Sequence, residues 1–309
     1  MKFAVIGPGA LGCLLAVHLA EAGQDVVLLD HRAERARFIN ERGIHVETES
    51  GERRVKVKVT DEPKQAADAD LVFVCVKAYS TRDAIAPVAA LLGKNARVLT
   101  LQNGLGNVEA LADVVGRNRV WGGTTAQGAT ELGLGQIRHG GRGDTAIAPA
   151  KLGVDKDRLD EVAAILNSAN VTTRVEADVN SLIWSKLIVN VGINPLTALT
   201  RLRNGQLLEH LGTQNIMETA VAEASAVAKA LKVKLLYPDP LERVRDVARV
   251  TAPNVASMLQ DILAMRRTEI DHINGAVADY GAKLGIPTPV NQTLTDLVKT
   301  IQASYGDRV

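Results

Sequence analysis

A glycine-rich turn near the start of the chain constrains the fold more than any other feature of the sequence. The turn follows an apolar run at residues 3–6 and precedes a segment of helical periodicity at residues 10–22. In such a strand–turn–helix unit the glycines permit a tight turn, a close approach of the backbone to a pyrophosphate, and close packing of helix on strand. The free N–H groups at the start of the helix favour an anion there. The residues of this predicted dinucleotide site are Gly7, Pro8, Gly9, Ala10, Leu11 and Gly12. The alternative is a glycine turn that holds no ligand.

The first half of the chain alternates between two periodicities. Apolar runs that predict buried strands, and amphipathic segments that predict helices, follow one another up to about residue 175. The predicted strands are residues 26–29, 71–76, 97–101 and 120–127, the predicted helices are 33–41 and 81–92, and a hairpin joins 45–48 to 55–60 around Ser50-Gly51. This alternation favours a doubly wound, parallel sheet of the Rossmann type over residues 1–175. A second glycine-rich stretch, residues 140–143, is predicted to be a hairpin turn.

The second half of the chain has little strand signal. Long helical stretches are predicted at residues 179–202, 216–231, 256–284 and 294–304, separated by prolines. We therefore expect an all-α domain over residues 176–309, which carries the substrate, the catalytic groups and the dimer contact. The fold class is α/β with an N-terminal Rossmann-like sheet and a helical C-terminal domain.

Composition and charge exclude several classes of protein. The 309 residues are 46% hydrophobic and 23% charged with a net charge of +1, as in an ordinary globular protein without nucleic acid or an anionic membrane as its main partner. No apolar run reaches the roughly 18 residues that span a bilayer, and the first residues lack a signal sequence, so a cytoplasmic location is expected. Cys13 and Cys75 have no metal-ligand spacing and are predicted to be reduced, buried thiols.

The end of the second predicted strand bears on the choice of cofactor. An acidic residue at this point accepts hydrogen bonds from the ribose of NAD, whereas a nearby arginine can hold the extra phosphate of NADP. Asp30 favours NAD, while Arg32 and Arg35 favour NADP. The pattern leaves both cofactors open.

Three polar residues interrupt an otherwise apolar helix in the second half. Lys186, Asn190 and Asn194 are spaced by four residues, which places them on one helix face. A lysine among apolar neighbours has a lowered pKa, and it can then donate a proton near neutral pH. The alternative is that Lys186 extends to the surface and the asparagines bond local backbone.

Further candidates lie in two later segments and after two strands. Asn254, at a predicted helix start after Pro253, and Ser257, one turn on, could donate to a carboxylate; the alternative is a simple helix cap. Glu269 is predicted three turns beyond Ser257 near the same face, with a solvated charge run as the alternative. Lys77 and Asn103 follow apolar strands and should face the cofactor, because the carboxyl ends of parallel strands line the ligand crevice.

The sequence resembles the ketopantoate reductase family, the 2-dehydropantoate 2-reductases. The matching stretches occur in the family's order over nearly the whole chain. They are the turn at residues 7–12, Val76-Lys77, Gln102-Asn103-Gly104, Trp184-x-Lys186 with Asn190 and Asn194, Asn254-x-x-Ser257-Met258-Leu259-Gln260-Asp261, and Thr268-Glu269-Ile270-Asp271 with Ile273-Asn274-Gly275. The resemblance implies reduction of ketopantoate to pantoate with NADP, or with NAD as the alternative, on the route to pantothenate and coenzyme A. It also implies a cytoplasmic homodimer.

The resemblance implies a role for each candidate residue. Lys186 would be the general acid and Glu269 would orient the substrate or the lysine. Asn190 and Asn194 would position the substrate, and Asn254 and Ser257 would hold its carboxylate. Lys77 and Asn103 would bind the cofactor near the reacting centre.

One departure from the family and three alternatives remain. Family members place an arginine where His31 stands here, so we expect Arg32, one residue later, to take the phosphate-binding role; the alternative is a preference for NADH. The alternatives are a reductase of another 2-keto or imino acid, a relative of 6-phosphogluconate dehydrogenase, and a non-catalytic nucleotide sensor. The last is disfavoured by the joint presence of Lys186, Asn254, Ser257 and Glu269.

Overall fold

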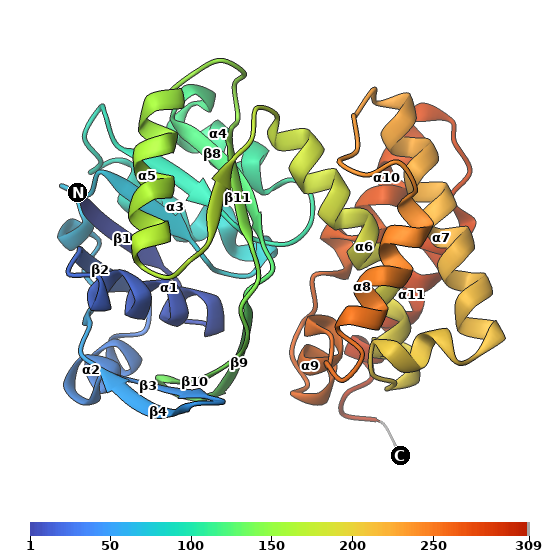
Figure 1. The fold of residues 1–309 in the computed structure, drawn as a ribbon, viewed down its shortest axis with the longest axis horizontal. Coiled ribbons are helices and arrows are strands. Elements are labelled where there is room, and N and C mark those ends of the chain that lie inside the picture. The colour runs from blue at the N-terminus through green and yellow to red at the C-terminus, as the bar shows by residue number, and fades with distance from the viewer. Residues whose placement is uncertain (308–309) are drawn as a thin grey trace. The chain divides into compact units, whose positions relative to one another are not determined.

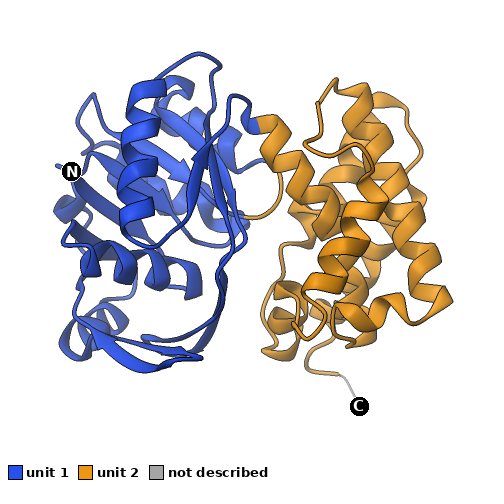
Figure 2. Ribbon diagram, in the orientation of Figure 1, with its two compact units in different colours: residues 1–102, 106–179 blue, residues 103–105, 180–309 orange. Residues whose placement is uncertain are grey.

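The computed structural model describes residues 1–307 and divides into two compact units. Unit 1 contains residues 1–102 and 106–179, and unit 2 contains residues 103–105 and the chain from Asn180 onward (Figure 2). The short segment 103–105 thus leaves the first unit and packs with the second. Each unit has its own apolar core of mainly aliphatic side chains.

An eight-stranded sheet forms the centre of unit 1. Its strands are β1 (Lys2–Ile6), β2 (Asp25–Leu29), β5 (Lys58–Thr60), β6 (Leu71–Val74), β7 (Arg97–Thr100), β8 (Val120–Thr125), β11 (Thr145–Pro149) and β12 (Thr173–Val175). They lie in the order β12-β11-β8-β7-β6-β1-β2-β5, and every neighbouring pair is parallel except β8 with β11. Strand β6 is buried along its whole length, as expected of a strand in the middle of a parallel sheet.

Helices alternate with these strands. They are α1 (Ala10–Glu21), α2 (Ala33–Arg42), α3 (Thr81–Ala89), α4 (Asn107–Val115) and α5 (Lys156–Ser168), with 3-10 turns η1 (Pro63–Ala66), η2 (Ala78–Ser80) and η3 (Arg117–Arg119). Figure 1 shows α5 in front of the sheet and α3 behind it. This arrangement confirms the expected Rossmann-like, doubly wound fold, with an antiparallel step at β11 that the apolar pattern did not indicate.

A second, four-stranded sheet lies on the far side of α1. Its order is β4 (Gly51–Val55), β3 (Ile44–Thr48), β10 (Gln136–Gly141) and β9 (Gly128–Gly133). Helix α1 contacts strands of both sheets and is therefore covered on two sides. Its sequence is accordingly apolar on nearly all of its faces. His18 of α1 meets His139 of β10 edge to face, with ring centroids 5.6 Å apart.

Two expectations about this region are wrong. The predicted strand 55–60 is two strands: β4 ends at Val55, and β5 then joins the main sheet beside β2, where Val57 and Val59 become buried. Residues 140–143 are not a hairpin turn, because β10 and β11 belong to different sheets. A Cβ at Gly143 would lie 2.4 Å from the Ala126 carbonyl oxygen. This glycine therefore permits the backbone segments around residues 126 and 143 to pass close to each other.

Unit 2 is built from helices, as expected. They are α6 (Val179–Thr200), α7 (Leu211–Ala230), α8 (Pro240–Val250), α9 (Ser257–Leu263), α10 (Asn274–Leu284) and α11 (Pro289–Ala303), with 3-10 turns η4 (Gly205–Leu208) and η5 (Ile270–His272). Pro240 and Pro289 occupy first-turn positions, where the missing N–H costs nothing.

The expected single helix over residues 256–284 is wrong. Helix α9 ends at Leu263, and Met265 follows in the left-handed conformation with φ of 52°. The N–H of Arg266 donates to the carbonyl of Asp261 (2.8 Å), and that of Met265 donates to Ile262 (3.1 Å). This pair of bonds is a Schellman motif, which satisfies the last carbonyls and turns the chain away from the helix axis.

Helix α6 bears on the expectation that no segment of the chain spans a membrane. It is the one helix of residues 1–307 that is long and apolar enough to cross a membrane by length and composition. However, 72% of its most apolar window is buried within the structure, so the apolar surface is accounted for by packing as a core helix.

Candidate active site

The glycine turn has the geometry that a pyrophosphate requires. Gly7 has φ of 103°, and a Cβ on it would lie 2.8 Å from Val76 Cγ1. A Cβ on Gly12 would lie 2.0 Å from the Gly7 carbonyl oxygen, which forces glycine where helix meets strand. A Cβ on Gly9 would meet no atom within 4 Å, so open space lies beside the backbone there. Gly9 also gives α1 no side-chain cap, which leaves the helix N-terminus available to an anion.

The acidic residue after β2 is already engaged within unit 1. Asp30 is only 3% exposed, and its carboxylate accepts hydrogen bonds from Nε of Arg35, from Nη2 of Arg35 (2.7 Å) and from the backbone N–H of Arg32 (3.1 Å). The Arg32 side chain is exposed, and its guanidinium has no partner among residues 1–307. The structure therefore places a buried acid and an unpaired arginine side by side.

The loops after β6 and β7 are joined by one glutamine. Nε2 of Gln102 donates to the Val76 carbonyl oxygen (2.7 Å) and to Thr81 Oγ1 (2.9 Å). Lys77 follows Val76 directly and occupies the N-cap position of the 3-10 turn η2, without a side-chain capping bond. Gln102 thus fixes the loop that carries Lys77, a role that the sequence pattern did not assign. A polar side chain at the end of a buried strand was the available signal.

Asn103 lies in the short segment that packs with unit 2. The N–H of Leu105 donates to the carbonyl oxygen of His272 (2.8 Å), and His272 Nδ1 lies 3.0 Å from the Leu105 carbonyl oxygen. A Cβ on Gly104 would lie 2.5 Å from the His272 carbonyl oxygen. Asn103 is therefore carried by a segment that is held against η5. His272, three residues after Glu269 in the sequence, is the structural residue that holds this segment.

Lys186 has an environment that lowers its pKa. It lies on α6 among buried aliphatic side chains, and burial lowers the pKa of its ammonium group to about 8. The charge of Glu269 opposes part of this shift. Asn190 and Asn194 follow at intervals of one helical turn on the same face of this continuous helix. Nδ2 of Asn190 is buried without a hydrogen-bond partner among residues 1–307, so it is a free donor beside Lys186.

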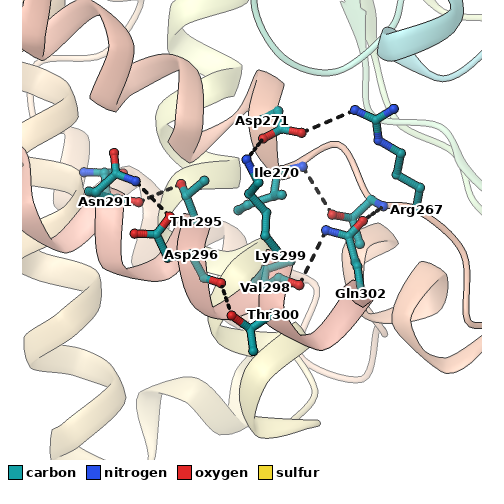
Figure 3. Close-up of polar contacts among 12 residues, drawn as sticks. Arg267, Ile270, Asp271, Asn291, Thr295, Asp296, Val298, Lys299, Thr300 and Gln302 are labelled. Carbon is teal, nitrogen blue, oxygen red and sulfur yellow. Dashed lines mark hydrogen bonds and ion pairs between the residues drawn. The ribbon is translucent and has the colours of Figure 1, made fainter. Parts of the chain in front are cut away.

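The segment that carries Glu269 is anchored to α11. Glu269 itself is 7% exposed. Figure 3 shows Asp271 paired with Lys299 (3.2 Å) and Arg267 (3.4 Å). The N–H of Thr268 also donates to Gln302 Oε1 (2.7 Å). These contacts fix the backbone of the segment that carries Glu269, whose carboxylate acts on Lys186.

The predicted positions of Asn254 and Ser257 need correction. Helix α9 begins at Ser257, so Asn254 lies in the preceding loop and does not start the helix. Glu269 lies beyond the end of α9, so it does not share a helix face with Ser257. The side chains of Asn254 and Ser257 are both exposed, and the carbonyl of Asn254 accepts the Asn204 N–H (3.1 Å). The geometry leaves both side chains available to a ligand.

The fold and the glycine turn define a Rossmann-like α/β protein with a helical second unit. Sequence comparison gives the family. The profile described as "Ketopantoate reductase PanE/ApbA" matches residues 3–151, and "Ketopantoate reductase PanE/ApbA C terminal" matches residues 178–302. The chain belongs to the ketopantoate reductase family.

Individual relatives and solved structures are similar to this chain over nearly its whole length. The 2-dehydropantoate 2-reductase of Halobacterium salinarum is 40% identical over 306 residues, which cover 98% of this chain and 99% of the relative, and that of Archaeoglobus fulgidus is 33% identical, covering 97% of each. The PanE/ApbA family ketopantoate reductase of Ralstonia eutropha has a similar structure, with a TM-score of 0.89 at 35% identity over 98% and 99% of the two chains. A D-mandelate dehydrogenase solved with NADH and anilino(oxo)acetate has a TM-score of 0.93 at 26% identity, over 98% and 99%.

Proposed function

We propose that this enzyme reduces 2-dehydropantoate (ketopantoate) to pantoate with NADPH, in the biosynthesis of pantothenate and coenzyme A. The observation that carries the proposal is Lys186, a half-buried lysine whose apolar surroundings lower its pKa to about 8, in a chain of the ketopantoate reductase family. When bound, the reduced nicotinamide supplies the hydride. The chain supplies orientation, charge and a proton.

Lys186 is suited to the role of general acid. Its pKa of about 8 keeps the ammonium group mainly protonated at neutral pH while making the proton easier to give up than that of an exposed lysine. The positive charge stabilises negative charge that develops on the ketone oxygen, and the proton then passes from Nζ to that oxygen. Glu269 keeps the pKa of Lys186 from falling further, and so preserves the protonated form.

The remaining polar groups are assigned to the substrate and the cofactor. The free Nδ2 of Asn190 and the amide of Asn194 position the keto acid, and the exposed Asn254 and Ser257 hold its carboxylate. The glycine turn of residues 7–12 binds the pyrophosphate, and Lys77 and Asn103 bind the nicotinamide side of the cofactor.

The contacts of Asp30 support NADPH over NADH. Because Arg35 and the Arg32 N–H occupy its carboxylate, Asp30 is poorly placed to accept a hydrogen bond from a ribose hydroxyl. The exposed guanidinium of Arg32 can pair with a 2′-phosphate instead. In this proposal Asp30 positions the arginines, and Arg32 selects the cofactor.

Initial rates of cofactor oxidation with ketopantoate test both parts of the proposal. We expect turnover with NADPH, and we expect Arg32→Ala to raise the KM for NADPH by about tenfold to a hundredfold while leaving that for NADH within twofold. A matched control is Arg37→Ala, an exposed arginine within α2, the helix that Arg32 precedes. A preference of the wild type for NADH would make Asp30 the selector, and no turnover with either cofactor would reject ketopantoate as the substrate.

A second candidate function is reduction of another 2-keto acid. The similarity to a D-mandelate dehydrogenase solved with NADH, at a TM-score of 0.93, favours it. Comparing ketopantoate with benzoylformate at both cofactors separates the two reactions. A non-catalytic nucleotide sensor would turn over neither acid.

We also propose that the enzyme is a cytoplasmic homodimer that associates through unit 2. An apolar groove of about 520 Å³ lies between α6, α7 and α11, and Leu211 beside it is 77% exposed. Such an apolar surface is typical of a contact between subunits. Light scattering measures the mass, and Leu211→Glu is expected to shift it toward the monomer.

A further inference from the structure

We infer that Glu223, Asn291 and Asn274 form a buried hydrogen-bonded network that replaces the hydrogen bond lost at Pro195 and thereby positions the turn of α6 between Asn190 and Asn194. We call these three residues the Asn274 network. The inference rests on the proposed function in one respect: that this turn is the one assigned to the substrate.

Pro195 creates the need for such a network. It lies inside α6, where its ring nitrogen has no N–H to donate to the carbonyl four residues earlier. That carbonyl belongs to Val191, which is fully buried. A buried carbonyl without a partner is costly, so the helix at this turn depends on a donor from elsewhere. Nδ2 of Asn274, at the start of α10, lies 3.3 Å from this oxygen.

The rest of the network fixes the orientation of Asn274. Its Nδ2 also donates to Oδ1 of Asn291 (2.9 Å), and neither asparagine is exposed. Nδ2 of Asn291 donates to Glu223 Oε2 (2.7 Å) and to the Ala220 carbonyl oxygen (3.0 Å). The two oxygens of Glu223 also accept the N–H groups of Val290 and Asn291, at 2.9 Å each. Side chains from three helices thus form one connected series, and only its last member, Asn274, contacts the Val191 carbonyl of α6.

The position of that carbonyl links the network to the site. Val191 follows Asn190, whose buried Nδ2 has no partner within residues 1–307 and depends on the backbone for its direction. On the other side of Pro195, Thr197 Oγ1 donates to the carbonyl of Asn194 (2.9 Å). A Cβ at Gly192 would lie 2.8 Å from Val244 Cγ1, so α8 packs directly on the same turn. The turn before the proline is therefore held from outside the helix by Asn274 and by α8, while the Thr197 hydroxyl bonds the Asn194 carbonyl from within the helix.

A double-mutant cycle between Pro195 and Asn274 tests the inference. In Pro195→Ala the new N–H can donate to the Val191 carbonyl, which makes the Asn274 amide redundant. We expect Asn274→Ala to raise the KM for ketopantoate by about tenfold in the wild-type background and by less than about threefold in the P195A background. The KM for NADPH should stay within twofold throughout. The thermal midpoint should show the same coupling, with a smaller loss from N274A in the P195A background than in the wild type.

Asn167→Ala is the matched control. Asn167 lies on α5 in unit 1 and makes two hydrogen bonds with the backbone of Thr173, at 2.9 and 2.8 Å. Its loss should lower the thermal midpoint and leave the KM for ketopantoate unchanged, with no dependence on residue 195. This separates loss of stability from loss of positioning.

Two results would overturn the inference. Equal effects of N274A on KM in both backgrounds would mean that Asn274 does not act through the Val191 carbonyl, and a lowered midpoint with an unchanged KM would leave the network a structural role only. If N274A does not fold, Asn291→Ala is measured in both backgrounds, with the same expected dependence on residue 195. A wild type without turnover on ketopantoate would reject the proposed function instead, and uncoupled thermal midpoints would then reject the network on their own.

Discussion

At the scale of single residues, two opposed effects set the acidity of Lys186. Burial among the aliphatic side chains of unit 2 disfavours the charged ammonium, and this is the larger effect. The charge of Glu269 favours the ammonium but does not cancel the burial, so the pKa settles at about 8. A proton donor with this pKa is matched to work near neutral pH.

This balance predicts the pH dependence of catalysis. Because the protonated form of Lys186 is the donor, kcat/KM should be constant below pH 8 and fall about tenfold per unit above it. Glu269→Gln removes the charge that raises the pKa of Lys186, so the fall should begin at lower pH.

Lys186→Ala should lose at least about a hundredfold in turnover while cofactor binding, measured by fluorescence titration, is kept.

Lys229→Ala is the control for this prediction, because Lys229 is an exposed lysine near the end of α7. It should have wild-type turnover and the same pH profile. Near-normal turnover of K186A, or a profile that stays flat to pH 10, would remove Lys186 from the mechanism.

At the scale of elements, the ends of the helices in unit 2 are set by local chemistry. Helix α8 begins with Asp239 at its N-cap, whose carboxylate accepts the N–H of Glu242 (3.0 Å), and with Pro240 in the first turn. These residues form a start signal that is readable from sequence. The end of α9 is different, because Met265 carries no such signal in its residue type.

The cap of α8 gives a prediction of stability. Asp239→Ala removes the side-chain acceptor, and we expect a loss of about 1 kcal/mol in the free energy of unfolding of unit 2. Urea unfolding followed by Trp184 fluorescence in a Trp121→Phe background reports on this unit, because the two tryptophans lie one in each unit. Asp246→Ala, which removes an exposed ion pair with Arg249 from the same helix, should cost less than about 0.5 kcal/mol. Equal losses would mean that the cap bond contributes nothing specific.

At the scale of the whole molecule, unit 1 depends on packing that links two sheets through one helix. His18 of α1 and His139 of β10 meet where the helix packs on the second sheet. Burial, together with the smaller effects of His139, Arg53 and Arg142, lowers the pKa of His18 to about 4 against the opposing effect of Glu21. Burial also lowers the pKa of His139.

The unfolding of unit 1 should therefore be sensitive to mild acid. His18 is neutral in the folded state and binds a proton near its ordinary pKa of 6.5 when unfolded, so its contribution is intact above pH 6.5 and is lost progressively down to about pH 4. The shift corresponds to a loss of about 3 kcal/mol over that window. Urea unfolding followed by Trp121 fluorescence, in a Trp184→Phe background, measures it.

His18→Gln is the comparison for the acid effect. A glutamine cannot take up the proton, so the stability of this variant should vary less between pH 6.5 and pH 4 than that of the parent. Parallel pH profiles of the two proteins would show that other groups control acid unfolding.

Local sequence patterns were enough to predict much of the architecture and the position on one helix face of Lys186, Asn190 and Asn194. The strand–turn–helix of residues 2–21 and the spacing of Lys186, Asn190 and Asn194 depend only on neighbours within a few turns, so periodicity was enough to predict them. The predictions fail where distant segments compete for the same residues. Residues 55–60 divide between two sheets, and residues 256–284 break into two helices, because burial elsewhere outweighs local periodicity.

The sequence by itself determined the Rossmann-like first unit, the helical second unit and the glycine turn. Each follows from the periodicity of hydrophobic residues and from positions that only glycine or proline can occupy. Only the tertiary structure decided the partners of buried polar groups. Asp30 could have faced a ribose, and the structure pairs it with Arg35. Asn274 could have been a helix cap, and the structure turns it toward the carbonyl that Pro195 leaves free. Hydrogen-bond partners distant in sequence leave no periodic signal, because they are chosen by the packing of whole helices and not by the residues beside them.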